Sequence, residues 1–191
     1  YLSTMGRHEE AIVEANRLLT LDPLPYVTRS VVINVYHYAR QYEDAIEVGR
    51  RTIELDPEDA RIYWEMAVNY EQLGQHGDAH QSRLAALRLS ATPAEAIAVY
   101  DSLYRQLGPD AYPQWMFMRA GPQSCESAYG LVTAAWIHMR LGEKEKALDV
   151  LEEAYEKREG IMLTINADPK WDLLRGEPRF RNLLRRMNFP E

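Results

Sequence analysis

Residues 70–79 read YEQLGQHGDA, and this short stretch decides the fold. It closes one amphipathic pattern, in which apolar residues recur every three or four positions, and it opens another after Gly74. A glycine can supply the positive φ that ends a helix and lets the chain reverse, and Ala79 leaves room for a second helix to cross the first. Tyr70, one turn before Gly74, places a large ring between the helices. The stretch therefore predicts a helix, a turn and an antiparallel second helix.

The same features recur along the chain at a spacing of 34 residues. Three registers carry the pattern: Gly6, Gly74, Gly108 and Gly142, with Arg40 in the remaining slot; Tyr36, Tyr70, Tyr104 and His138; and Ala11, Ala45, Ala79 and Ala147, with Pro113 in the slot between. Repetition at a fixed period of this length is typical of helical repeat proteins, in which each hairpin buries its apolar face against the next. We therefore predict an all-α fold of stacked antiparallel helix pairs.

The pattern divides the chain into frames and a tail. The predicted frames are 1–25 (partial, entered within its first helix), 26–59, 60–93, 94–127 and 128–160, followed by an extended segment and a capping helix in 161–191. The predicted helices are 8–21, 25–39, 42–55, 58–73, 76–89, 93–107, 113–118, 127–141 and 144–157, with a helical turn at 168–174, a final helix at 178–187 and residues 161–165 extended. A terminal helix with one apolar face is expected where a solenoid needs its open end covered.

Composition limits the classes of function. The chain has 191 residues, of which 46% are hydrophobic and 27% charged, and it contains no apolar run long enough to cross a membrane. The formal net charge of −7 repels phosphate backbones, so no nucleic acid partner is expected. Cys125 is the one cysteine, which excludes an internal disulfide and suits a reducing compartment. We expect a cytoplasmic location, with the periplasm as the alternative.

The glycine, aromatic and alanine positions, which are clearest at residues 74–86 and 142–147, resemble the tetratricopeptide repeat family. The resemblance implies a right-handed superhelix of helix pairs that binds proteins. The tail, from Ala134 through Glu152 and Asp168 to Phe180, is similar to the carboxyl-terminal repeat regions of large bacterial signalling proteins that carry winged-helix, kinase or nucleotide cyclase domains. That likeness implies a regulatory or assembly role, with an effector domain upstream of Tyr1.

Three residues depart from the family pattern. Arg40 stands where glycine is usual, and Gly49 and Arg83 stand where a larger apolar residue would pack. We therefore expect the second and third hairpins to be packed less tightly than the last.

In such a superhelix the first helix of each pair lines the concave face, which predicts the binding residues. They are Asn34, His37, Tyr38, Arg61, Trp64, Arg105, Tyr129, Trp136 and Arg140. Aromatic rings and arginines carry most of the binding energy at protein interfaces, and arginine pairs readily with carboxylates. The alternative is that these rings pack against neighbouring helices. The first hypothesis is a scaffold that binds a peptide or protein on this face, and the second is self-association into a homo-oligomer.

Other chemistry finds less support in the sequence. His76 and His80 have a spacing that can chelate a metal, but no third ligand is evident, so no metal and no cofactor are expected. Phosphate-binding loops, nucleophile elbows and metalloprotease helices are missing, which predicts that the chain is not an enzyme. The one basic cluster is Arg175, Arg179, Arg181, Arg185 and Arg186. Pairing with acidic neighbours such as Glu177 explains it more simply than contact with nucleic acid or a membrane.

Overall fold

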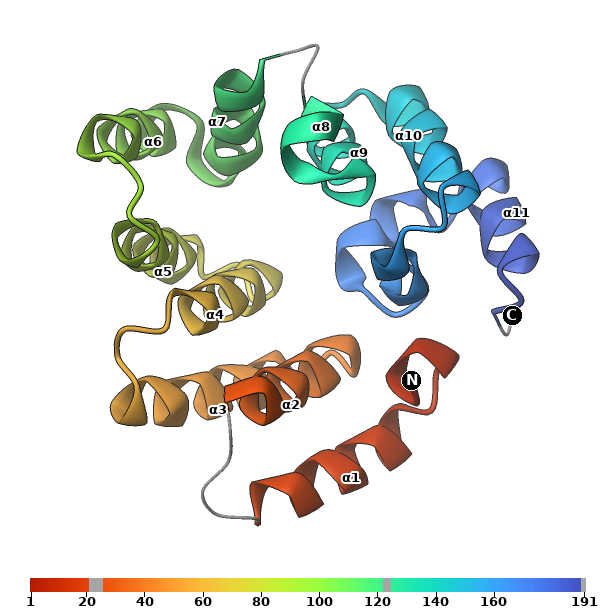
Figure 1. Cartoon of the computed structure of the whole chain (residues 1–191), viewed down its shortest axis with the longest axis horizontal. Helices are drawn as coiled ribbons and strands as arrows, with labels where there is room; N and C mark the ends of the chain where they lie inside the picture. The colour runs from red at the N-terminus through yellow and green to blue at the C-terminus, as the bar shows by residue number, and fades with distance from the viewer. Residues whose placement is uncertain (21–25, 122–124, 190–191) are drawn as a thin grey trace. The chain divides into compact units, whose positions relative to one another are not determined.

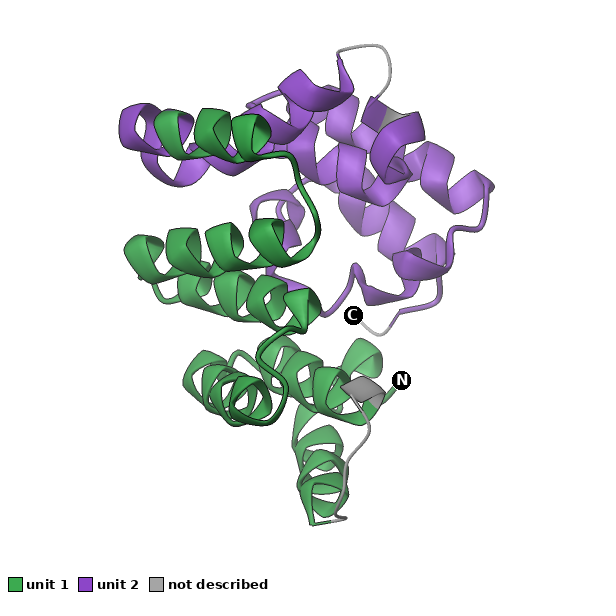
Figure 2. Ribbon diagram, turned by 60° about the vertical axis from the view of Figure 1, so that its left-hand side comes forward, with its two compact units in different colours: residues 1–102 green, residues 103–191 purple. Residues whose placement is uncertain are grey.

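A computed structural model describes residues 1–20, 26–121 and 125–189. All regular structure in these ranges is helical, which confirms the predicted all-α class. The chain forms two compact units, residues 1–102 and 103–191 (Figure 2).

Unit 1 is a series of helices, and its first five α-helices each pack against the next along the chain (Figure 1). Its elements are η1 (Ser3–Met5), α1 (His8–Leu19), α2 (Tyr26–Tyr38), α3 (Tyr42–Leu55), α4 (Ala60–Gln72), α5 (His76–Leu89) and α6 (Ala94–Leu107), the last of which crosses the boundary between the units. The predicted ends at Leu21 and Pro25 lie outside the described residues, and the prediction for 76–89 matches α5 at both ends. The core between α1 and α5 includes Ile33, Ile46, Ile62, Met66 and Tyr70.

The turns follow the sequence register closely. All five residues spaced by 34 adopt a positive φ: 76° at Gly6, 62° at Arg40, 70° at Gly74, 59° at Gly108 and 83° at Gly142. At the clearest turn, the amide of Gln75 donates to the carbonyl of Tyr70 at 2.9 Å and that of Gly74 to the carbonyl of Glu71 at 3.0 Å. This pair of bonds satisfies carbonyls that the end of α4 would otherwise leave open. Arg40 adopts the same conformation without being a glycine.

The alanine register is buried wherever a helix crosses its neighbour. Ala11, Ala45, Ala79 and Ala147 are at most 4% exposed, so each of these positions has room for little more than a methyl group. Pro113, which takes the fourth slot, is also buried, in a helix that begins at Ala111 rather than at Pro113 itself.

The expectation that the second and third hairpins pack less tightly than the last stays a prediction, but neither Gly49 nor Arg83 leaves the core open. A methyl group built on Gly49 would lie 2.6 Å from Cγ of Met66, so the Met66 side chain fills the space beside this glycine. Arg83 is buried, and its guanidinium lies 2.6 Å from a carboxylate oxygen of Glu71. A close approach and a buried ion pair replace the apolar side chains that the family pattern would supply.

Unit 2 contains the shorter helices and the tail. Its elements after α6 are η2 (Gly108–Asp110), α7 (Ala111–Ala120), α8 (Cys125–Tyr129), α9 (Leu131–Arg140), α10 (Lys144–Glu156), η3 (Gly160–Thr164), η4 (Pro169–Leu174) and α11 (Pro178–Arg186). The single helix predicted for 127–141 is wrong, because the chain breaks at Gly130, where φ is 79°. The Glu159 carboxylate accepts hydrogen bonds from the backbone amides of Leu131 and Val132 at 3.1 and 3.4 Å. These bonds satisfy the first two amides of α9, where the new helix begins.

The tail covers the end of the last helix pair. Residues 161–165 were expected to be extended, but most of them lie in the 3₁₀ helix η3, so that prediction is wrong. Trp171 of η4 and Phe180 of α11 are fully buried, with ring centroids 6.5 Å apart. The short helices 169–174 and 178–186 agree with the predicted turn and final helix to within a residue.

Ion pairs fasten α11 to α10. Arg179 bonds Glu145, Asp149 and Glu152 at 2.7 to 3.0 Å, and these carboxylates raise its pKa. Arg186 pairs with Glu156 and lies over the ring of Tyr155. Part of the basic cluster is therefore paired as expected, although Glu177 itself pairs with Lys144.

Candidate functional site

Helices α2 and α4 are neighbours in unit 1, and three polar side chains meet between them. Ser30 and Asn34, one turn apart on α2, both donate to Oε1 of Glu65 on α4, Asn34 at 3.5 Å. Asn34 also donates to the carbonyl of Ser30 at 2.9 Å, which fixes its amide. We call Ser30, Asn34 and Glu65 the Glu65 cluster. It places a carboxyl group on the face that the sequence predicts for binding.

The charge of Glu65 is unusual for an acidic side chain. Burial raises the pKa of this carboxyl to about 7, against the opposing effect of the Ser30 hydroxyl. Its second oxygen, Oε2, is buried and accepts no hydrogen bond from the described residues. A buried polar atom without a partner costs about 1–3 kcal/mol.

A second polar pair lies one turn further along the same helices. Asn69 donates through Nδ2 to the carbonyl of Glu65 at 2.8 Å, so its Oδ1 faces His37. Nδ1 of His37 lies 3.0 Å from that oxygen and must therefore carry the proton. The imidazole is buried, with the rings of Tyr38 and Tyr42 at 5.6 and 5.8 Å. His37 thus joins α2 to α4 through Asn69.

Three predicted residues lie around the cluster. Trp64 and Tyr38 are half-buried, so each keeps part of its ring accessible. Arg61 is exposed, but its Nε and Nη2 lie 3.0 and 3.1 Å from the carboxylate of Asp59. Asp59 also accepts the Arg61 amide at 3.0 Å and so caps α4. Arg61 would have to leave this pair to grip a ligand.

The predicted residues of unit 2 make packing contacts. The Tyr129 hydroxyl donates to the carbonyl of Met116 at 3.1 Å, and burial raises the pKa of this phenol. Trp136 is half-buried, 6.3 Å from the ring of Tyr112. Arg140 pairs with Asp110 at 2.6 Å, and Arg105 is exposed near the end of α6. These side chains therefore hold α7, α8 and α9 together at least as much as they face solvent.

Glu65 and Asn69 were missed at the sequence level, although a signal was present. They fall three and seven residues after Ile62, on the stripe that also carries Met66. A carboxyl and an amide on an otherwise apolar stripe indicate a buried polar network.

The two histidines considered as metal ligands lie in different environments. His76 is exposed, whereas His80 is buried with Nε2 2.9 Å from Asp101. Within the described ranges, no group of three or more His, Cys, Asp and Glu side chains could hold a metal ion.

The last helix pair decides the family. Residues 128–156, which end α8 and form α9 and α10, match the tetratricopeptide repeat model. This chain carries a tetratricopeptide repeat. Such repeats generally mediate protein–protein interaction, and their all-helical fold is typically a non-enzymatic module. No curated protein and no solved structure matches the chain.

Within the matched repeat, the register positions lie where α9 and α10 pack together. His138 and Ala147, on the aromatic and alanine registers, are fully buried where α9 and α10 meet. Among the helices described, none is long and apolar enough to cross a membrane.

Proposed function

We propose that the chain binds a protein or peptide on the face formed by α2 and α4, with the Glu65 cluster at its centre. The observation that carries this proposal is the position of Tyr38 and Trp64, two half-buried aromatic residues that lie beside the Glu65 cluster on neighbouring helices. Oε2 of Glu65 is itself buried, so a partner would contact the rings around the cluster rather than this atom. The half-buried rings of Tyr38 and Trp64 would contact apolar side chains of the partner.

A peptide display experiment against the intact chain tests this proposal. Peptides that bind are synthesised, and their affinities are measured for the unsubstituted chain and for Trp64→Ala and Glu65→Gln. We expect Trp64→Ala to weaken binding by about 2 kcal/mol, which is roughly 30-fold. The matched control is Leu55→Ala, which truncates an exposed side chain at the end of α3.

Two outcomes decide between the predicted faces. If Trp64→Ala and Glu65→Gln leave the affinities unchanged while Trp136→Ala weakens them, the binding face is that of α9 in unit 2. If none of the three matters, this face is not the binding surface.

Self-association is the second candidate, and exposed apolar side chains of the tail favour it. Ile161, Leu163 and Leu173 are 49%, 62% and 67% exposed. Sedimentation velocity across micromolar concentrations tests it, with Leu173→Asp as the variant that should restore the monomer. A chain that stays monomeric throughout excludes this candidate.

The finer biological role rests on the tail. Its likeness to repeat regions of large bacterial signalling proteins supports a regulatory or assembly role for the binding face. Co-purification of the full-length protein with its partner, with and without Trp64→Ala, tests that role directly.

A further inference from the structure

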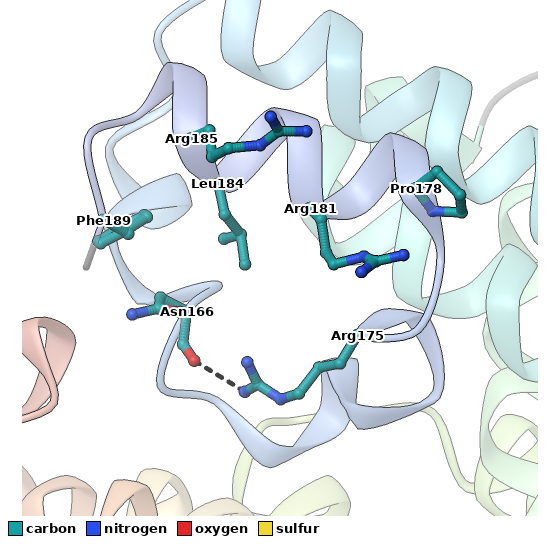
Figure 3. A pocket seen from close by; sticks show the side chains of 7 residues that line it. All are labelled: Asn166, Arg175, Pro178, Arg181, Leu184, Arg185 and Phe189. Atoms are coloured by element: carbon teal, nitrogen blue, oxygen red, sulfur yellow. Dashed lines mark hydrogen bonds between the residues drawn. The ribbon is translucent and has the colours of Figure 1, made fainter. Parts of the chain in front are cut away.

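The tail of unit 2 contains a pocket of about 600 Å³ between η4, α11 and the segment before η4 (Figure 3). Its lining combines cationic, apolar and amide side chains: Asn166, Arg175, Pro178, Arg181, Leu184, Arg185 and Phe189. Arg181 and Leu184 point from α11 into the opening, and Arg175 lies on the opposite side (Figure 3). Three arginines thus line one cavity in a chain with a net charge of −7.

The arginines of α11 differ by face. Arg179 and Arg186 pair with carboxylates of α10. Arg181 and Arg185 line the pocket, and within the described residues neither forms an ion pair; Arg181 has a long contact of 3.5 Å with the carbonyl of Gly176. Acidic side chains are abundant in this chain, yet those described leave these two cations without a counter-charge. An anion in the pocket would supply it.

Arg175 is already oriented for such an anion. Its Nε lies 2.6 Å from the Asp172 carboxylate, and its Nη2 donates to the carbonyl of Asn166 at 2.7 Å. These bonds hold the guanidinium at the pocket wall, so little side-chain entropy is lost when a ligand binds. A planar guanidinium with remaining N–H groups suits a carboxylate or phosphate.

The rest of the lining is apolar. Leu184, Phe189 and Pro178 offer hydrocarbon surface beside the charges. The volume falls within the range of about 300–1,000 Å³ that small-molecule sites occupy. A long polyanion fits less well, because the acidic chain as a whole repels it.

We propose that this pocket binds a small organic anion: a carboxylate or phosphate group joined to an apolar body. Arg175 and Arg181 contact the anionic group, and Leu184 and Phe189 contact the body. Arg185 adds positive charge at the same wall. This site is independent of the α2–α4 face, so either proposal can fail while the other stands.

Titrations followed by NMR with four probes test the site. The probes are phenyl phosphate, benzoate, inorganic phosphate and phenol. We expect saturable binding of phenyl phosphate or benzoate, with amide shifts at Asn166 and Phe189, at least tenfold weaker binding of inorganic phosphate, and none of phenol. Whichever of phenyl phosphate and benzoate has the lower dissociation constant identifies the preferred anionic group.

A pair of charge-matched variants on α11 provides the control. Arg181→Gln should weaken binding of the aromatic anion at least tenfold. Arg186→Gln removes the same charge from the same helix, but Arg186 does not line the pocket, so binding should stay within about twofold. Equal weakening by both variants would indicate general charge attraction and would overturn the site. Failure of both aromatic anions to saturate below about 10 mM would overturn it as well.

Discussion

Arg40 adopts the left-handed backbone that the other four positions of its register give to glycine. Because arginine has a Cβ atom, this backbone conformation costs about 1–2 kcal/mol. A glycine would avoid that strain, but it would lose more backbone entropy on folding, which offsets part of the gain. Nη1 of Arg40 donates to the Tyr42 hydroxyl at 3.3 Å. The repeat therefore tolerates a strained residue at one of its turns.

We expect Arg40→Gly to stabilise the chain by about 0.5–1 kcal/mol, because the strain outweighs the entropy of the added glycine. Urea unfolding measured by circular dichroism checks the change. The control is Arg51→Gly, which makes the same substitution inside α3 and should destabilise by about 1 kcal/mol. A loss of stability in both variants would show that position 40 is not strained.

Glu65 makes stability depend on pH in a direction opposite to that of most carboxylates. Its pKa is about 7 in the folded chain against 4.5 for an ordinary glutamate, so the folded state holds the proton more tightly. Its contribution to stability is complete below pH 4.5, falls as pH rises through 7, and is then lost. The total is on the order of 3 kcal/mol.

Glu65→Gln should therefore remove this decline between pH 4.5 and 7 and raise the free energy of unfolding at pH 8 by about 1–2 kcal/mol. Urea unfolding at several pH values measures both effects. Glu54→Gln, at an exposed position of α3, should keep the decline. Parallel curves for Glu65→Gln and the unsubstituted chain would contradict the assignment.

What the sequence could predict at this scale depended on periodicity. The positive φ at residue 40 follows from the spacing of the glycines, even though an arginine fills the slot. The raised pKa of Glu65 could not be predicted from the sequence, because it depends on how closely α2 covers α4. Asn34 and His37 were predicted from their helical positions, whereas their partners Glu65 and Asn69 required the packing of two helices.

At the scale of helices, α3 and α4 lie close together at Gly49. Gly49→Leu should destabilise the chain by about 1–3 kcal/mol, because the side chains of Met66 and Ile62 on α4 would have to move. Thermal or urea unfolding measures the loss. Gly77→Ala, in α5, is the matched control: nothing lies within 4 Å of its added methyl, so the variant should be stabilised by up to about 1 kcal/mol. A Gly49→Leu variant as stable as the unsubstituted chain would rule out the close approach.

Helix ends were predictable where local residues determine them. The start and end of α5 follow from the glycine turn and the apolar pattern. The start of α9 does not, because a carboxylate from Glu159, 28 residues away from Leu131, accepts its first amides. Residues 161–165 are mostly apolar without a period, so the sequence pattern does not indicate the 3₁₀ helix η3, in which Met162 is buried.

At the scale of the whole molecule, stability should be distributed locally. In repeat proteins it is close to a sum of terms between neighbouring elements. Ile62→Ala should lower local stability by about 2–5 kcal/mol and speed hydrogen exchange in α3, α4 and α5. Exchange in α9 and α10 should stay unchanged. Mass spectrometry of peptides from each helix checks this.

The reciprocal variant is Leu148→Ala, in the core of unit 2. It should speed exchange in α9 and α10 and leave α3 and α4 unchanged. Acceleration across the whole chain by either variant would contradict locally additive stability.

The attachment of the tail to α10 limits how the chain can be lengthened. Trp171 and Phe180 of this tail are fully buried, and the ion pairs of Arg179 and Arg186 join α11 to α10. A duplicated unit placed directly after α10 would separate the tail from this helix. A whole unit of 34 residues inserted at the turn between α3 and α4 keeps every turn position in phase, and so offers the route by which such an array can be lengthened, in the laboratory or by gene duplication.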